Sequence, residues 1–137
     1  MNSTKDYKYT NIHYYDEVNS FIKKMKIPVM PSPALLQNKV MTDRLAHLAE
    51  EVQEFGFANN MSDIEGCVDA LIDTVYVALG TAVMMGLSEE QFRECWLRVH
   101  EANMKKTVVK MDGHKFGVSK PDGWEEPKFG DILNEIN

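Results

Sequence analysis

The segment from Ile64 to Met85 is apolar on almost every side of a helix, which predicts a helix buried on most of its sides. Three acids interrupt it, Glu65 near its start and Asp69 and Asp73 further along. Asp69 and Asp73 lie four residues apart, and Tyr76 and Gly80 continue the same stripe at spacings of three and four. An ionised aspartate in such a setting costs free energy unless it is paired or coordinates a cation. The segment therefore predicts a helical core that also carries charge.

Capping residues and prolines predict where the helices begin and end. A short first helix is expected with Asp16 as its N-cap, and Pro28 and the prolines after it stop that helix. A second helix is expected from about Lys39 to Ala58. The remaining signals are a capping box of Ser62 with Glu65 that opens the third helix, a stop at Gly86, and a capping box of Ser88 with Gln91 that opens the fourth.

Helical periodicity predicts which side chains share a face. In the second helix the apolar stripe is Met41, Leu45, Leu48, Val52 and Phe55. Four polar residues fall along one flank of that stripe, where we expect them to face a cleft beside the core: Arg44, His47, Glu51 and Glu54. In the fourth helix Phe92, Trp96 and Val99 form a stripe that Asn103 and Lys106 prolong, so these side chains are expected to face inward.

The length of 137 residues is sufficient for one domain with a core of its own. We therefore predict a single all-α domain over residues 1–137, a helical bundle of four to five helices. A polar N-terminal arm is expected over residues 1–15. The tail over residues 107–137 is basic and contains the glycines and prolines of an irregular segment, with a short hairpin predicted from Val108 to Val118.

Composition and charge exclude several classes of function. Fifteen basic residues against 21 acidic ones give a net charge of −6, which argues against a protein that wraps nucleic acid. The longest apolar stretch, Thr74 to Met85, is too short to cross a bilayer, so no membrane partner is expected. Cys67 and Cys95 show no ligand spacing and suit free thiols of a reducing compartment, which predicts a cytoplasmic protein.

Four acids on two helices, Glu51, Glu54, Asp69 and Asp73, need compensating charge. One interpretation is salt bridges to Arg44, Arg93 or Arg98. The other is a bound cation, since clustered oxygen ligands without thiolate or imidazole suit a hard divalent ion such as Mg²⁺ or Mn²⁺. The excess of acids over nearby cations favours the metal.

The lysines of the basic tail supply a complementary half of a phosphate site. Lys106 is placed near the carboxylates by helical phase, and Lys110, Lys115 or Lys120 are candidates to fold over a phosphate. For any one of the tail lysines except Lys106, a solvated surface position is the simpler interpretation. Acids that hold Mg²⁺ together with lysines that bind phosphate are the requirements of phosphoryl-transfer chemistry.

Three motifs, taken in the order in which they occur along the chain, make the sequence resemble a known family. They are LAEEVQEF at residues 48–55, DALIDTVYVALGTA at residues 69–82 and EANMKK at residues 101–106. The sequence is similar to the all-α NTP pyrophosphohydrolases, the MazG-like and phosphoribosyl-ATP pyrophosphohydrolase-like superfamily, in its small single-domain phage or bacterial type. The likeness runs from Val18 to the Gly123-Trp124 tail.

The resemblance implies the ligands of the metal. The family signature is ExxE on one helix and ExxD on the next. Glu51, Glu54 and Asp73 match it, whereas Ala70 stands where the first acid of the second motif belongs, and Asp69 is expected to serve in its place. One of Glu50, Glu51 and Glu54 is then the general base for the attacking water.

The resemblance also implies an activity and its substrate. The expected reaction is Mg²⁺- or Mn²⁺-dependent cleavage of a (d)NTP between the α and β phosphates, by a homodimer or homotetramer. Asn103 and Lys106 match the family's Asn-x-x-Lys element near the nucleotide. The expected substrate-binding residues are Asn103, Lys106, Lys110, Lys120 and Tyr76, with Tyr76 and Trp96 also suited to the core.

Alternatives to this activity remain open. Nothing in the tail selects the base, and a deoxypurine triphosphate is favoured only by the phage-like character of the chain. A narrow-substrate relative, dUTPase-like or specific for phosphoribosyl-ATP, would use the same metal-binding acids and phosphate-binding lysines. The alternative from another class of protein is a non-enzymatic helical binding module. In such a module the acids only form salt bridges with arginines.

Overall fold

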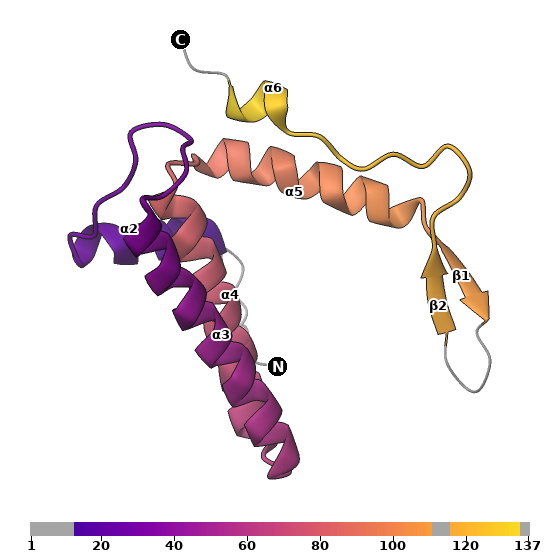
Figure 1. The fold of residues 1–137 in the computed structure, drawn as a ribbon, viewed down its shortest axis with the longest axis horizontal. Coiled ribbons are helices and arrows are strands. Elements are labelled where there is room, and N and C mark those ends of the chain that lie inside the picture. The colour runs from indigo at the N-terminus through magenta and orange to yellow at the C-terminus, as the bar shows by residue number, and fades with distance from the viewer. Residues whose placement is uncertain (1–12, 111–115, 135–137) are drawn as a thin grey trace, which may run out of the picture. The chain divides into compact units, whose positions relative to one another are not determined.

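The structure, a computed structural model, describes residues 13–110 and 116–134. Helices dominate this part of the chain, so the predicted all-α class is confirmed (Figure 1). The predicted hairpin is also confirmed, since Thr107 to Lys110 pairs antiparallel with Phe116 to Ser119. The elements are α2 (Tyr14–Lys24), α3 (Asn38–Asn60), α4 (Ile64–Met84), α5 (Glu89–Met104), β1 (Thr107–Lys110), β2 (Phe116–Ser119) and α6 (Gly130–Leu133).

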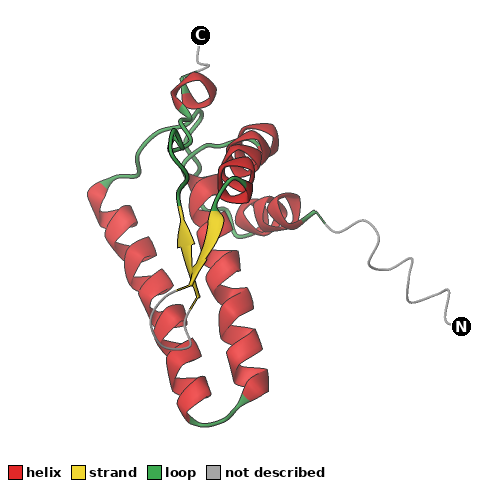
Figure 2. Cartoon of the chain, turned by 90° about the vertical axis from the view of Figure 1, so that its right-hand side faces the viewer, coloured by secondary structure: helices red, strands yellow, loops and turns green. Residues whose placement is uncertain are grey.

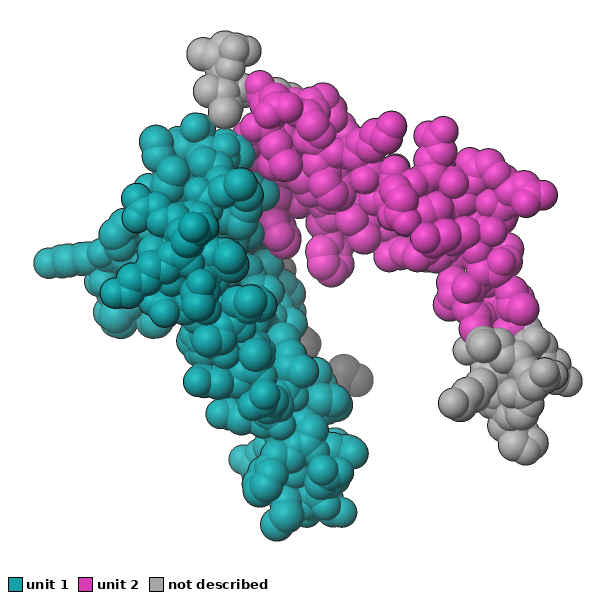
Figure 3. Space-filling model, viewed as in Figure 1, with its two compact units in different colours: residues 1–87 teal, residues 88–137 magenta. Residues whose placement is uncertain are grey.

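The chain divides into two compact units, residues 1–87 and residues 88–137 (Figure 3). The single domain predicted over residues 1–137 stays a prediction. Most of the predicted N-terminal arm lies outside the described residues. Its last two residues, Tyr14 and Tyr15, instead begin α2, where Tyr15 is buried and its hydroxyl donates a hydrogen bond to the Leu87 carbonyl at 2.7 Å.

In the first unit α3 and α4 run side by side, and α2 packs against α4 (Figure 2). Val18 and Ile22 of α2 are almost fully buried, and each is 2% exposed. Gly80 permits this approach, because a Cβ there would lie 3.0 Å from the Arg44 guanidinium and 3.6 Å from Ile22 and Val18. The core of this unit is completed by small and medium apolar side chains: Ala58, Cys67, Ala70, Val77, Val83 and Met84.

Two predicted N-caps are wrong. Helix α2 begins at Tyr14 with His13 at the N-cap position, so Asp16 lies within the first turn, where its charge still favours the helix dipole. Helix α4 is capped by Asp63, whose carboxylate accepts a hydrogen bond from the Gly66 N–H at 2.9 Å. Ser62 cannot cap α4 because its φ is 55°, outside the extended conformation of an N-cap residue.

The C-terminal end of α4 is held by a loop as well as by the predicted glycine. Gly86 has φ of 90° and follows the last turn, which confirms the predicted stop. The loop after α2 crosses this end. Its Met30 N–H donates to the Met84 carbonyl and its Ala34 N–H to the Met85 carbonyl, both at 2.9 Å. Carbonyls that a helix end leaves unpaired are thereby satisfied.

The apolar surface of α3 and α4 is more exposed than the sequence predicts. Met41, Leu45 and Val52 of the predicted α3 stripe are open to solvent, because α3 turns the flank with Arg44 and Glu51 toward α4. Helix α4 is buried on one side only. Its opposite side exposes Val68, Leu71, Ile72 and Val75, with Ile72 at 59% exposure.

Among the described residues, α4 is the one helix long and apolar enough to span a membrane by length and composition. Core helices of soluble proteins pass the same test, so this is weak evidence for a span. Asp73 lies near the middle of α4. An aspartate at the centre of a bilayer costs about 2.5–3.5 kcal/mol, which argues against insertion.

In the second unit α5 has the predicted N-terminus. Ser88 accepts a hydrogen bond from the Gln91 N–H at 3.1 Å, and the Gln91 side chain accepts one from the Ser88 N–H at 2.9 Å. The predicted inward stripe of this helix is wrong in part, since Trp96 is 64% exposed and Val99 is also exposed. The short helix α6, which lies near the end of the tail, buries Ile132.

A bidentate ion pair joins α6 to α5. Arg98 donates to both carboxylate oxygens of Asp131 at 2.7 Å, and also to the Lys128 carbonyl at 2.8 Å. The hydrogen bonds from Arg98 hold the pKa of Asp131 at about 2. This contact is local to the second unit and fixes the end of the tail.

Acid is expected to release α6 from α5. Because the pKa of Asp131 is depressed in the folded chain, its stabilising effect is complete above the ordinary carboxyl pKa, about 3.9, and is lost as the pH falls toward about 2. Hydrogen exchange at the Ile132 amide, compared between the wild type and Asp131→Asn, measures this. The difference between the two proteins should narrow below about pH 4 and vanish once the pH has fallen through about 2; a difference that persists well below pH 2 contradicts the assignment.

Candidate metal centre

Three of the predicted metal ligands come together between α3 and α4. Glu51 and Glu54 are three residues apart on α3 and so project from the same side of the helix. Asp73 faces them from α4. One carboxylate oxygen from each of the three residues lies within 4.8 Å of the others. We refer to Glu51, Glu54 and Asp73 as the acidic cluster.

Glu51 and Asp73 are the half-buried members of the acidic cluster, and Glu51 carries its one buried, unpaired oxygen among the described residues. The Glu51 side chain is 12% exposed, and its Oε2 atom is buried without a hydrogen-bond partner. Desolvation raises the pKa of Glu51, and repulsion from Glu54 and Asp73 raises it further. His47, one turn earlier on α3, places Nε2 3.4 Å from the other oxygen, Oε1. A carboxylate oxygen is therefore held in the interior with no donor to satisfy it.

The acidic cluster fits a hard divalent cation. Its donors are carboxylate oxygens alone, the ligands that Mg²⁺ and Mn²⁺ prefer. Mg²⁺ binds oxygens at about 2.0–2.1 Å, so two of its ligands lie at most about 4.2 Å apart. Three oxygens within 4.8 Å come close to that span. A cation here would satisfy the unpaired Glu51 oxygen and remove the repulsion.

The arginines proposed as alternative partners bind elsewhere. Arg44 donates to the Val77 carbonyl at 2.8 Å and to the Thr81 hydroxyl at 3.0 Å. Arg93 pairs with Glu89, and Arg98 pairs with Glu94 and Asp131. Within the described ranges, the ion pairs of these arginines do not include the acidic cluster. These arginines therefore do not neutralise the charge of the acidic cluster.

Asp69 and Glu50 lie outside the acidic cluster as the structure describes it. Asp69 is one turn before Asp73 on α4, about 6 Å along the helix axis, and its side chain is exposed. Ala70, at the position of the missing family acid, is buried at 2% exposure and contributes to the core. Glu50 is exposed on α3, where it lines a shallow pocket with Gln53, Glu54 and Phe57.

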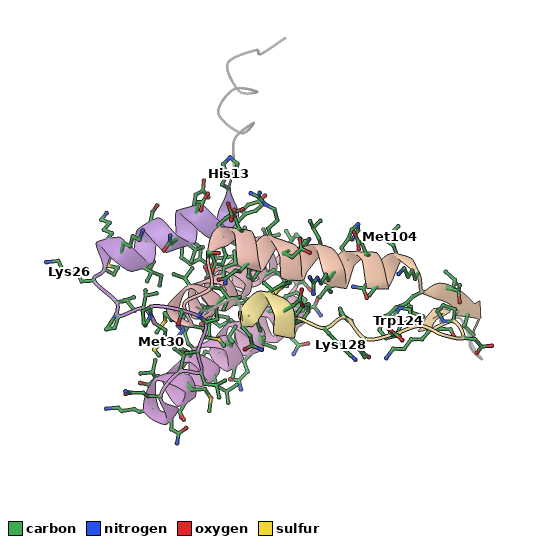
Figure 4. All side chains as sticks on the ribbon, turned by 90° about the horizontal axis from the view of Figure 1, so that it is seen from above. His13, Lys26, Met30, Met104, Trp124 and Lys128 are labelled. Atoms are coloured by element: carbon green, nitrogen blue, oxygen red, sulfur yellow. The ribbon has the colours of Figure 1, made fainter. Side chains whose placement is uncertain are left out.

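In the second unit, two of the predicted substrate lysines meet on a tryptophan. The Nζ atoms of Lys106 and Lys120 lie 5.1 Å and 4.7 Å from the centre of the Trp124 ring. The Trp124 indole N–H donates to the Ala102 carbonyl at 2.7 Å, which anchors the ring beside the end of α5 (Figure 4). Lys120 also pairs with Glu126 at 2.8 Å. We call Lys106, Lys120, Trp124 and Glu126 the lysine–tryptophan cluster.

Sequence reasoning did not place Trp124 and Glu126 beside the predicted substrate lysines. The one available signal was the tryptophan that follows Pro121 and Gly123 in a basic tail, because a tryptophan in an irregular segment needs a partner for its ring and its N–H. The pairing with Lys106 depends on the hairpin between them. Local sequence patterns do not reveal such a contact.

The other predicted substrate residues are placed separately. Asn103 is exposed near the end of α5, and Lys110 is a β1 residue whose side chain lies outside the description. Tyr76 is 38% exposed and packs edge-on against Phe21, with ring centres 5.5 Å apart. It also borders an apolar pocket of about 320 Å³ between α2 and α4, lined by Tyr14, Glu17, Val18, Leu71, Ile72, Val75, Tyr76 and Leu79.

The described part of the chain is thus an all-α fold with a carboxylate cluster on two adjacent helices. The family model of phosphoribosyl-ATP pyrophosphohydrolase matches residues 18–103, and the chain belongs to this family, a part of the MazG-like all-α NTP pyrophosphohydrolase superfamily. The matched region contains the acidic cluster and Asn103. A comparison with curated proteins gave no match.

Membership of the family defines the general activity. The protein is a pyrophosphohydrolase with a nucleotide substrate. Enzymes of this superfamily are generally dependent on divalent metals and are normally soluble. The lysine–tryptophan cluster lies wholly outside the matched region, since Lys106, Lys120, Trp124 and Glu126 all follow residue 103.

Proposed function

We propose that the protein is a divalent-metal-dependent (d)NTP pyrophosphohydrolase that cleaves between the α and β phosphates and releases (d)NMP and pyrophosphate. The unpaired, buried Glu51 oxygen within the acidic cluster is the observation that carries this proposal. Glu51, Glu54 and Asp73 would hold Mg²⁺ or Mn²⁺, with Asp69 as a further ligand. A bound cation would neutralise phosphate charge and orient the triphosphate.

The remaining roles in the proposed reaction fall to residues of the chain itself. One of Glu50, Glu51 and Glu54 accepts the proton of the attacking water, and the raised pKa of Glu51 suits that residue to this step. Lys106, Lys110 and Lys120 neutralise the phosphates. Asn103 donates hydrogen bonds to the sugar or base, and Tyr76 packs against the nucleoside.

We propose a deoxypurine triphosphate as the preferred substrate. Phosphoribosyl-ATP is the second candidate, since the description of the matching family names it. The two share the α–β phosphoanhydride bond, so the same cluster serves both. A dUTPase-like specificity is a third form of the same activity.

Product analysis tests the proposed function. The protein is incubated with each NTP, each dNTP and phosphoribosyl-ATP in the presence of Mg²⁺ or Mn²⁺, and the products are separated by ion-exchange chromatography. Nucleoside monophosphate and pyrophosphate in equal amounts, lost on addition of a chelator, are expected. Orthophosphate released without pyrophosphate would contradict cleavage between the α and β phosphates, and no turnover of any substrate would favour a binding module.

We also propose that the protein is a cytoplasmic homodimer or homotetramer. The support is the apolar side of α4 that one chain leaves exposed, since a contiguous apolar surface of this kind favours burial against another subunit. The exposed Met41, Leu45 and Val52 of α3 add to it. Sedimentation equilibrium of the whole chain measures the state directly.

A further inference from the structure

The β1–β2 hairpin brings two lysines opposite each other. Thr107 pairs with Ser119 in the antiparallel register, and Lys106 and Lys120 are the next residues outward on each side. Two positive side chains in facing positions repel each other and destabilise the pairing. The register of the hairpin thus builds a site of concentrated positive charge at its open end.

Trp124 fixes the positions of both ammonium groups. Each Nζ lies about 5 Å from the ring centre, within the range of a cation–π interaction. The hydrogen bond from the indole N–H to Ala102 holds the ring in place. The indole attracts the two cations but carries no net charge, so it orients them without neutralising them.

Glu126 is the anion that contacts this pair. Its carboxylate lies 2.8 Å from Lys120 Nζ, and the hydrogen bond from Lys120, together with the charge of Lys106, lowers the pKa of Glu126. Its side chain is 71% exposed, so it can turn into solvent at little cost. One carboxylate faces two ammonium groups, so one of the two positive charges is not neutralised.

We propose that Lys106 and Lys120, aligned on Trp124, form a binding site for a pyrophosphate group, and that Glu126 occupies this site until the ligand displaces it. Phosphate oxygens accept hydrogen bonds from both ammonium groups and carry more charge than the carboxylate they replace. The assignment of that pyrophosphate to the nucleotide substrate or its product rests on the proposed function. Glu126 is then a competing anion that weakens binding and favours release.

A titration with inorganic pyrophosphate tests the site without a metal. Binding to the whole chain is measured by isothermal titration calorimetry in the presence of EDTA, for the wild type and Glu126→Gln. Removal of the competing carboxylate should tighten binding about threefold or more, the scale of an exposed ion pair that no longer has to be broken. Glu125→Gln is the matched control, because it removes one exposed negative charge from the adjacent residue, and it should change the affinity much less.

The opposite outcomes overturn the proposal. If Glu126→Gln binds pyrophosphate no more tightly than Glu125→Gln, or if neither protein nor the wild type binds it, Glu126 does not hold a pyrophosphate site. Trp124→Leu provides a second measurement: with its helical circular dichroism retained, it should weaken binding severalfold in the Glu126→Gln background. Unchanged affinity in that double variant removes Trp124 from the site.

Failure of this inference is distinct from failure of the proposed function. Nucleotide hydrolysis is measured separately with Mg²⁺ present. Turnover together with equal pyrophosphate affinity in Glu126→Gln and the wild type overturns the inference and leaves the enzyme. Tighter pyrophosphate binding by Glu126→Gln in a protein that hydrolyses no nucleotide supports the anion site and removes the enzyme.

Discussion

Glu51→Gln is expected to lower turnover by at least about 10²-fold while the metal-free protein becomes more heat-stable. Glutamine keeps the size of the side chain and removes its negative charge. The charge is needed to bind a cation, but without a cation it is a buried carboxylate oxygen with no donor, close to Glu54 and Asp73. Activity and stability should therefore move in opposite directions in this variant.

Thermal unfolding with and without Mg²⁺ measures the second part of this expectation. The wild type should gain stability from Mg²⁺, and Glu51→Gln should gain much less, since ligand binding raises the stability of the state that binds it. Asp43→Asn is the matched control: it removes an exposed charge from the same helix, and its turnover and response to Mg²⁺ should be those of the wild type. A less stable Glu51→Gln protein with an unchanged Mg²⁺ response would show that the cluster is structural.

Gly86→Ala is expected to destabilise the protein by about 3 kcal/mol or more. The backbone at this position has φ of 90°, a conformation that residues other than glycine rarely adopt. A methyl group there would lie 2.5 Å from the Ser32 carbonyl oxygen and 2.7 Å from that of Met30. Both oxygens belong to the loop that crosses the end of α4, so the loop would have to move. Urea unfolding followed by circular dichroism measures the loss.

Gly56→Ala provides the matched control for this substitution. Gly56 lies inside α3, and a Cβ added there meets nothing within 4 Å. The same chemical change should therefore stabilise the protein by about 0.5–1 kcal/mol, because alanine is the better helix former. Equal effects at the two glycines would show that the contact with the loop does not determine the conformation at Gly86.

Local sequence signals predicted most of the helices but only some of their ends. The capping box at Ser88 was correct because both partners lie within one turn and nothing else competes for them. At α4 the adjacent Asp63 competes with Ser62, and a left-handed Ser62 backbone decides between them. Single-sequence patterns do not distinguish such neighbours.

The same limit applies to the faces of the helices. The apolar stripe of α3 predicted the wrong side as buried, since Arg44 faces α4 and donates to the Val77 carbonyl, and Glu51 faces Asp73 in the acidic cluster. The acids at positions 51, 54 and 73 were found from their spacing, since helical geometry places them. The lysine–tryptophan cluster requires the hairpin register, which links residues distant in sequence.

The loop between α2 and α3 has no regular secondary structure, yet it is tied to the rest of the first unit. Its Met30 and Ala34 amides are bonded to the last carbonyls of α4, and Pro28 restricts its backbone. A protease must bind its substrate in an extended form with free amides. Two amides of this loop are already hydrogen-bonded and are not free to pair with a protease. The loop should therefore resist proteolytic cleavage, although it has the composition of an ordinary connecting segment.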